Sequence, residues 1–443
     1  MSPPKEEYKI SESPLGTARH VRIITIGAGA SGINMIRTLR EKLTNYEHVV
    51  YEKNPSVGGT CNWKWPEIQG LHDFKGDLLH TANWPKDYEY AGKRVAVIGN
   101  GSSGVQVVPA LQPHVTELTH FIRSPLWVTP SQQQMIAMKP GNILEDVEMD
   151  GDKFTPRQIE RFTSDPDYYL RQTAKWAKQM LTQYMTASLG GEEKLTKTLI
   201  PDFAVGCRRL TPAVGYLQSL TAKNVRVVTD KITEIVPTGI KISTGEIIEV
   251  DALVCATGFD VSFCPRFPII GRNGNLQGIW TKNLPRAYMS SSIPDFPNYF
   301  MFLGPNAPIG HGSVFTITEH VAKYIATVIH KCQTESILSL CPTSSALDDF
   351  SEHIDAFMPR TAWASTCRSW FKDGKEDGPV TALHPGSRIH WFHMLESFRG
   401  EDFEFRREAR NRFLYLGNGF STKELGDGDK TWYLGSIKDG KGI

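Results

Sequence analysis

The chain has 443 residues, of which 40% are hydrophobic, and it carries 49 Lys and Arg against 48 Asp and Glu. This length allows two or three domains, and the balanced charge gives no indication of a nucleic-acid or membrane-surface partner. No run reaches the roughly 18 apolar residues of a membrane span. The polar residues 1–20 also lack the apolar core of a secretory signal.

The seven cysteines are scattered and form no C-x-x-C pair, so neither a zinc site nor a redox dithiol is predicted. We therefore expect no metal, and we expect reduced thiols in a cytoplasmic protein. The positions are Cys61, Cys207, Cys255, Cys264, Cys332, Cys341 and Cys367.

The first predicted element is a short apolar strand that runs into a glycine-rich loop and then a helix-like stretch. The segment "VRIITIGAGASG" (21–32) fits G-x-G-x-x-G in the strand–loop–helix context that this motif requires. The glycines allow a tight turn, close approach of a pyrophosphate, and packing of the helix on the strand. The predicted cofactor contacts in this loop are Gly27, Gly29, Ser31 and Gly32.

The next strand ends in "HVVYEK", which places Glu52 20 residues after the loop. A carboxylate there accepts hydrogen bonds from ribose hydroxyls and repels a 2′-phosphate, which suits FAD or NAD. Gly59 and Thr60, in the following "VGGT", are further candidates for contact with this nucleotide.

A second strand–loop–helix unit, "KRVAVIGNGSSG" (93–104), has the same layout as the first. Both strands are apolar on both faces, which predicts buried parallel strands. The second unit continues to "LTHFIRSP", where Arg123 and Ser124 replace the acid and suit a 2′-phosphate. FAD plus NADPH is the simplest pair of nucleotides. The remaining predicted contacts are Gly99, Asn100, Gly101, Ser102, Ser103, Gly104 and Gln106.

The segment of about residues 135–200 reads as a helical insertion in this second unit, and "TPRQIERF" begins with a plausible N-cap. After it, "NVRVVTDKITEIVPTGIKISTGEIIEV" alternates in the way strands of a small sheet do. We expect this small sheet to return the chain to the nucleotide-binding core.

Between the two units lies "FKGDLLHTANWP" (74–85), which places Phe74, Gly76, His80 and Trp84 in the order F-x-G-x-x-x-H-x-x-x-W. This resembles the fingerprint of the Baeyer–Villiger monooxygenases, within the wider class of flavin-containing monooxygenases. Trp84 favours the Baeyer–Villiger branch over relatives that oxidise nitrogen or sulfur. The resemblance implies that His80 couples the two domains during turnover, and we assign it no proton transfer.

Later segments continue the resemblance from about residue 20 to the C-terminal part. "GCRRLTP" (206–212) is similar to the segment that carries the family's active-site arginine, which falls on Arg209, and "VDALVCATGFD" resembles the close of the pyridine-nucleotide domain. "GPNAPIGHGS" resembles the loop near the flavin, and "CRSWFKDG" places Trp370 at the border of the cofactor and substrate cleft. "HPGSRIHWF" and "RFLYLGNGF" look like the C-terminal part of fungal members of the family that act on polyketides and related products.

The resemblance implies that NADPH reduces the flavin, which adds O2 to form a C4a-peroxyflavin. Arg209 would supply the fixed positive charge that stabilises this anion and the following tetrahedral intermediate. The expected substrate is a hydrophobic ketone, converted to an ester or lactone in secondary metabolism. Oxidation of nitrogen or sulfur is the alternative within the enzymes.

The spacing between the two units is short, since only 47 positions separate Glu52 from Gly99. A nucleotide domain needs further strands after its ribose-binding strand. Compared with the family, roughly 100 residues are missing where "VGGT" runs into "CNWKWPEIQG", including the aspartate that orients the arginine. A truncated, non-catalytic NADPH-binding relative is therefore a further alternative.

These observations predict an α/β protein with two Rossmann-like dinucleotide-binding domains and an incomplete FAD domain. Residues 1–20 form a polar tail, and residues 21–61 begin the FAD domain. Residues 62–260 form the NADPH domain with its helical insertion. Residues 261–443 form the C-terminal part of the FAD and substrate domain.

Overall fold

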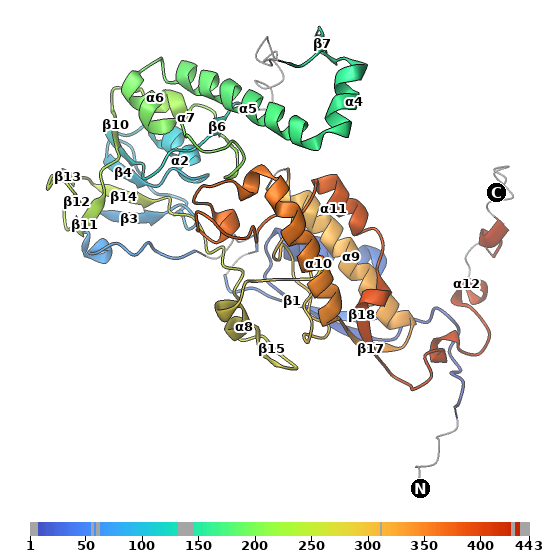
Figure 1. Cartoon of the computed structure of the whole chain (residues 1–443). Helices are drawn as coiled ribbons and strands as arrows, with labels where there is room; N and C mark the ends of the chain where they lie inside the picture. Colours follow the sequence, from blue (N-terminus) through green and yellow to red (C-terminus); the bar gives the residue numbers. More distant parts are fainter. Residues whose placement is uncertain are drawn as a thin grey trace. The chain divides into compact units, whose positions relative to one another are not determined.

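The computed structural model describes residues 8–54, 57–58, 63–131, 146–151, 153–310, 312–426 and 430–434. The chain divides into two compact units (Figure 1). Unit 1 comprises Met1–Thr60, Phe263–Phe357 and Thr381–Ile443, and unit 2 comprises Cys61–Ser262 and Met358–Val380. Searching the described residues found no helix with the length and apolar character to span a membrane.

Unit 2 is built on a five-stranded parallel sheet in the order β10-β5-β4-β14-β3. The central strands β4 and β14 are almost wholly buried, as the apolar sequence of the second unit predicted. The strands are β3 (Asp77–His80), β4 (Arg94–Ile98), β5 (Glu117–Phe121), β10 (Val225–Val228) and β14 (Ala252–Cys255).

Helices cover this sheet, and three of them come from the predicted insertion. Thr155 caps the first, because its side chain accepts a hydrogen bond from the Gln158 amide, which confirms the predicted N-cap. Residues 132–145 lie outside the described part of the chain. The helices are α2 (Gly104–Leu111), α4 (Pro156–Ser164), α5 (Pro166–Ser188), α6 (Glu193–Leu199) and α7 (Tyr216–Ser219).

The predicted small sheet is confirmed for three antiparallel strands, β11 (Ile232–Val236), β12 (Gly239–Ile242) and β13 (Ile247–Glu249). The first strand of the predicted segment, β10, instead pairs with β5 in the main sheet. From it the chain enters β14, which lies between β3 and β4 in the main sheet. Two short pairs complete unit 2, namely β6 (Val128–Thr129) with β9 (Thr211–Pro212) and β7 (Met149–Asp150) with β8 (Lys153–Phe154).

In unit 1, β1 (Val21–Ile26) pairs in parallel with β2 (Tyr46–Tyr51), and these two strands form the whole sheet among the described residues. Helix α1 (Ala30–Lys42) packs against α9 (Val314–Thr334) around a core that includes Leu39, Ile317 and Val328. The other elements are α8 (Leu276–Lys282), α10 (Ser344–Phe357), α11 (Arg388–Met394), α12 (Thr422–Leu425), the pair β17 (Ile337–Pro342) and β18 (Phe403–Arg407), and the pair β15 (Ile270–Gly271) and β16 (Gly274–Asn275).

The prediction that β1 is buried on both faces is wrong. Ile24 is 54% exposed and Ile26 is 63% exposed, whereas Ala96 and Val97 in the corresponding strand β4 are fully buried. The apolar sequence of β1 is that of an interior strand, but no strand of the described residues covers its second edge.

The prediction that all cysteines are reduced is also wrong, because Cys207 and Cys367 form a disulfide with a Cα–Cα distance of 6.4 Å. Their separation of 160 residues hides the pair from any analysis of spacing. Such bonds are uncommon in the cytosol, and the cytoplasmic location stays a prediction.

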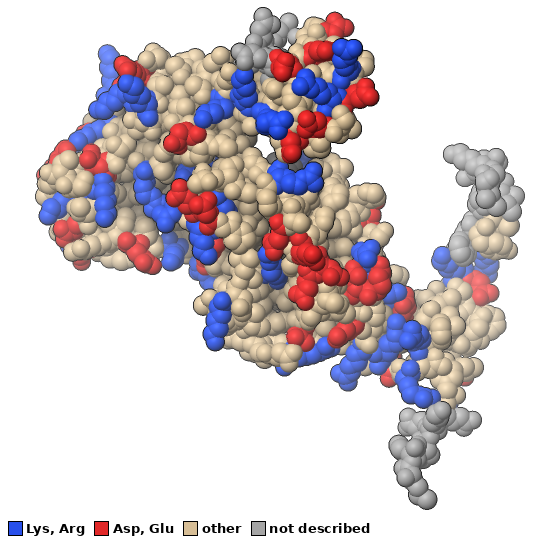
Figure 2. Space-filling view, in the orientation of Figure 1, with Lys and Arg blue, Asp and Glu red and all other residues tan. Residues whose placement is uncertain are grey.

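Figure 2 shows basic and acidic side chains interspersed over the visible face, without one large area of a single sign. This agrees with the formal net charge of +1.

Candidate functional site

The two glycine-rich loops have nearly the same backbone geometry. Their first glycines, Gly27 and Gly99, have φ angles of +99° and +103°, which side chains disfavour. A Cβ on Gly32 would lie 2.1 Å from the Gly27 carbonyl oxygen, and one on Gly104 would lie 1.9 Å from that of Gly99. The third glycine of each motif is therefore required for the helix to pack beneath its loop.

Both helices that follow the loops begin without a side-chain cap. Helix α1 starts after Gly29 and α2 after Ser103, and neither residue makes a capping hydrogen bond through its side chain. In α2 the amides of Val105 and Gln106 already donate to the carbonyls of Gly101 and Ser103. Among the described residues, the first turn of α1 is therefore more open to an anion than that of α2. At Gly101 an added Cβ would meet nothing within 4 Å, so the second loop leaves room for a ligand.

Polar side chains brace the second loop from several elements. Asn100 Nδ2 donates to the Ser124 carbonyl at 2.9 Å, and Ser102 Oγ lies 3.1 Å from Thr211 Oγ1. Gln106 Nε2 donates to the Ser102 carbonyl at 2.6 Å. These bonds connect the loop to the ends of β5 and β9.

Glu52 lies at the end of β2, next to the first loop. Its carboxylate accepts hydrogen bonds from the Ala28 amide at 2.7 Å and the Asn54 amide at 2.9 Å. The amides of Asn54 and then Ala28 hold the pKa of Glu52 below its usual value. The negative charge is thus fixed beside the loop, while Gly59 and Thr60 lie outside the described residues.

A cluster of cations occupies the equivalent place in unit 2. Arg208 Nη1 lies 3.3 Å from Ser124 Oγ and donates to the Pro125 carbonyl at 3.1 Å. Burial, and then the charge of Arg123, lower the pKa of Arg208. Neither arginine has an ion pair among the described residues, so the cluster has the donors and charge of an anion site.

Arg208 is a site residue that the sequence motifs did not predict. The pairing of β9 with β6, which joins Thr211 to Val128, brings the loop that follows Cys207 back to Ser124. The sequence held one signal for this role, since Arg208 stands directly before the predicted active-site arginine, Arg209.

Arg209 is half-buried, and its guanidinium makes no hydrogen bond or ion pair within the described part of the chain. It is therefore a fixed positive charge without a carboxylate to orient it.

His80 is the last residue of β3 and is 1% exposed. Its Nδ1 accepts a hydrogen bond from the Ala82 amide at 3.1 Å, and its Nε2 lies 3.4 Å from Thr257 Oγ1. The ring stacks on Trp63 with centroids 4.3 Å apart. Burial lowers the pKa of His80, so the ring is held neutral at the edge of the sheet.

The other members of the fingerprint pack unit 2. A Cβ on Gly76 would lie 2.4 Å from the Asp251 carbonyl oxygen and 2.6 Å from the Phe74 ring, so this position needs glycine. Trp84 contacts Tyr88 edge to face, with centroids 5.9 Å apart. Both rings are half-buried against the main core.

Trp370 lies in the segment Met358–Val380, which belongs to unit 2 although its flanks belong to unit 1. The sequence-based division had placed all of residues 261–443 together. Trp370 is half-buried and contacts Phe371 with centroids 4.7 Å apart.

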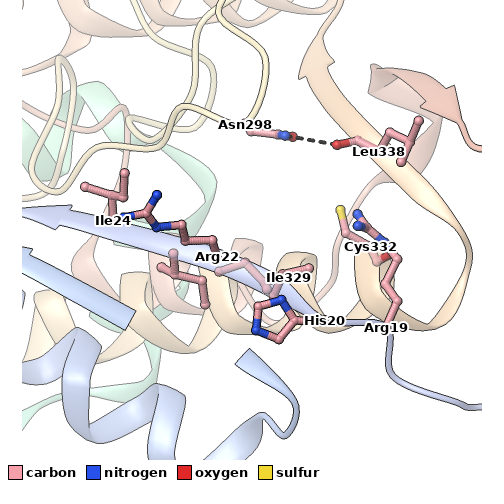
Figure 3. Close-up of a pocket in the computed structure, with 10 residues that line it drawn as sticks. Arg19, His20, Arg22, Ile24, Asn298, Ile329, Cys332 and Leu338 are labelled. Carbon is pink, nitrogen blue, oxygen red and sulfur yellow. Dashed lines mark hydrogen bonds between the residues drawn. The ribbon is translucent and has the colours of Figure 1, made fainter. Parts of the chain in front are cut away.

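A cavity of about 330 Å³ in unit 1 runs beside β1 (Figure 3). Its walls include Arg22, Ile24, Asn298 and Cys332, and no residue of β2 contributes. It therefore lies on the side of β1 away from its partner strand. None of the predicted nucleotide contacts borders it.

Two glycine-rich loops, one beside a carboxylate and one beside two arginines, are typical of an oxidoreductase fold that binds two nucleotides. A family model described as "NAD(P)-binding Rossmann-like domain" matches residues 25–86. The chain is 38% identical over 405 residues to the FAD-binding monooxygenase tazF of Aspergillus terreus. The aligned region covers 85% of this chain and 70% of tazF. The chain belongs to the FAD-binding monooxygenases, and the cofactors of this family are FAD and NADPH.

Two further comparisons show what else the chain is similar to. The chain is 29% identical over 325 residues to a Baeyer-Villiger monooxygenase of Pseudomonas aeruginosa, covering 71% of this chain and 60% of that protein. The structure of cyclohexanone monooxygenase from Rhodococcus sp. Phi1 bound to NADP+ has the same fold, with a TM-score of 0.71 at 21% identity. The superposed region covers 89% of this chain and 100% of the cyclohexanone monooxygenase chain.

The comparison with the FAD-binding monooxygenase stcW of Emericella nidulans reveals a difference in length. The two are 30% identical over 527 positions, covering 93% of this chain and 87% of stcW. Since 527 exceeds the 443 residues present here by 84, at least that many aligned positions of stcW face a gap in this chain.

Proposed function

We propose that this chain is an NADPH- and FAD-dependent monooxygenase that converts a hydrophobic ketone to an ester or lactone. The observation that carries the proposal is the contrast between the two ribose ends, with Glu52 at one and Arg123, Ser124 and Arg208 at the other. This contrast supports one nucleotide without a 2′-phosphate and one with it. By analogy with fungal relatives, we place the reaction in secondary metabolism and in the cytoplasm.

The residues present fit both nucleotides. The loop at Gly27, with the open N-terminus of α1, would hold the FAD pyrophosphate, and Glu52 would accept hydrogen bonds from its ribose. The loop at Gly99 would hold the NADPH pyrophosphate, and Arg208 would share its 2′-phosphate with Arg123 and Ser124. When bound, the flavin supplies the redox and oxygen chemistry.

Arg209 would place a permanent positive charge where negative charge develops during oxygen transfer. His80, neutral and stacked on Trp63, would fix the edge of the sheet and move no proton. Trp370 would border the substrate cleft.

We also propose that part of the FAD domain is missing between residues 60 and 62. In a doubly wound sheet the first strand has a neighbour on each side, whereas β1 has one among the residues that the structure describes. The cavity beside β1 and the surplus of aligned stcW positions support the same view. An FAD domain without this part would retain flavin weakly. The chain would then bind NADPH without catalysis, which is the alternative function.

Purified protein tests the proposal. Bound yellow flavin, with NADPH consumption that depends on an added ketone and yields an ester, supports the monooxygenase. A colourless protein that still binds NADPH supports the non-catalytic alternative, and oxidation of an added amine or sulfide instead of the ketone would reassign the chemistry. Sequencing the transcript across codons 57–65 tests the missing segment.

A further inference from the structure

We infer that the Cys207–Cys367 disulfide is a positioning device for Arg208 and Arg209. It joins the arginine loop, residues 203–210, to the returning segment, residues 358–380. The inference rests on the proposed NADPH site, because the role of Arg208 belongs to that site.

The bond lies inside unit 2, where Cys207 is fully buried and Cys367 is 5% exposed. The two backbones also approach closely beside it, since a Cβ on Gly206 would lie 3.3 Å from Ala362 Cβ. The arginine loop therefore packs directly on the returning segment, and the disulfide makes this contact covalent.

The returning segment is shaped by its own hydrogen bonds. Lys372 Nζ donates to the Ser365 carbonyl at 2.6 Å, and Arg368 Nε donates to the Gly374 carbonyl at 2.9 Å. The Ser369 amide donates to the Lys375 carbonyl at 3.2 Å. These bonds hold the turn around Trp370, whereas the disulfide holds that turn against the arginine loop.

The position of residue 207 decides where the two arginines point. Arg208 follows it directly and reaches Ser124 Oγ and the Pro125 carbonyl. Arg209 has no side-chain partner in the described part of the chain, so its direction depends on the backbone. The disulfide ties the backbone at Cys207 to that at Cys367, with their Cα atoms 6.4 Å apart.

The double variant Cys207→Ala, Cys367→Ala tests the inference in the full-length protein. Cys341→Ala is the matched control, because Cys341 is a buried, free thiol of β17. Three measurements are needed: mass spectrometry of unreduced peptides, hydrogen exchange of the two joined segments, and the ratio of NADP+ to NAD+ affinity.

We expect wild-type protein to yield a cross-linked peptide that contains both cysteines. In the double variant, residues 203–210 and 358–380 should exchange faster, and the preference for NADP+ should fall about tenfold, the scale of one charge-assisted hydrogen bond. The Cys341→Ala variant should match the wild type in both.

Two free thiols in the wild type, or unchanged exchange in the joined segments, would overturn the inference. So would a lower melting temperature with an unchanged preference for NADP+, since a bond that only stabilises the fold gives that result. A wild type without preference for NADP+ would instead contradict the proposed NADPH site, and hydrogen exchange would still decide whether the disulfide fixes the loop.

Discussion

The two nucleotide-binding units start from almost the same sequence pattern and end in different sheets. In unit 2, β4 lies between β5 and β14 and is buried. In unit 1, β1 has β2 as its one partner within the described part of the chain and exposes Ile24 and Ile26. The loops after the two strands nevertheless share their φ angles and their glycine contacts. The loop geometry is therefore local, while burial of the strand depends on distant segments.

The two units should differ most in the stability that they lose when a lysine is placed at equivalent positions. These positions lie three residues before Gly99 and Gly27, the first glycines of the two loops. Ala96→Lys buries an unpaired charge in β4 and should destabilise unit 2 by more than about 4 kcal/mol. Ile24→Lys, at a 54% exposed position, should change stability by less than about 0.5 kcal/mol. Urea denaturation followed by tryptophan fluorescence measures both.

Ile24→Lys should also reduce self-association, because charges on an open strand edge oppose edge pairing. Light scattering checks this. If Ile24→Lys unfolds unit 1, the face of β1 is covered in solution and the contrast between the sheets is lost.

Acid should weaken both units through buried histidines, of which His120 and His384 should contribute most. Burial lowers the pKa of His120 in unit 2 to about 4 and that of His384 in unit 1 to about 3. Unfolded histidine titrates near pH 6.5, so below that pH the unfolded chain binds a proton that the folded chain does not. Stability should therefore fall from about pH 6.5 to pH 4, by up to about 3 kcal/mol for His120.

The His120→Gln variant should flatten this dependence in unit 2, and the exposed His114→Gln should not. Urea titrations at pH 7 and pH 4.5 supply the comparison. An unchanged slope in His120→Gln would show that another group causes the acid sensitivity.

Within the second loop, stability and binding should separate. Gly104→Ala forces a methyl group against the Gly99 carbonyl and should cost about 1–3 kcal/mol of unfolding free energy. Gly101→Ala meets open space and should leave stability unchanged while weakening NADP+ binding, since the methyl group occupies room for the pyrophosphate. Thermal unfolding and calorimetric titration distinguish the two, and equal effects would argue against a ligand at Gly101.

The smallest effect concerns the cation cluster of unit 2. Arg208→Ala should weaken NADP+ binding about tenfold, or about 1.4 kcal/mol, and leave NAD+ binding unchanged. Arg226→Ala, which removes an exposed ion pair with Glu246, is the control. If Arg208→Ala weakens both nucleotides equally, the 2′-phosphate is bound elsewhere.

The sequence predicted the features that depend on neighbouring residues. Both glycine motifs, the Thr155 cap and the small sheet of β11–β13 follow from local rules of turns, caps and alternation. These rules could not show that Ile24 is exposed. The sequence of an apolar strand is the same whether or not an adjacent strand is present in the sheet.

The missed features of the site all involve residues far apart in the chain. Cys207 and Cys367 meet across 160 positions, and Arg208 reaches Ser124 only because β9 pairs with β6. Spacing along the chain carries no signal for such contacts, so the disulfide and the place of Arg208 beside Arg123 and Ser124 appear only in three dimensions.

The place of β14 between β3 and β4 also determines how late in synthesis of the protein the main sheet can form. β3 ends at His80 and β14 ends at Cys255, so the facing edges of β3 and β4 have no partner until 175 further residues have been made. At ~5–20 residues per second, a ribosome needs about 9–35 s for that distance. During this time the nascent chain presents two open strand edges, and slowing translation before Ala252 would lengthen its dependence on chaperones.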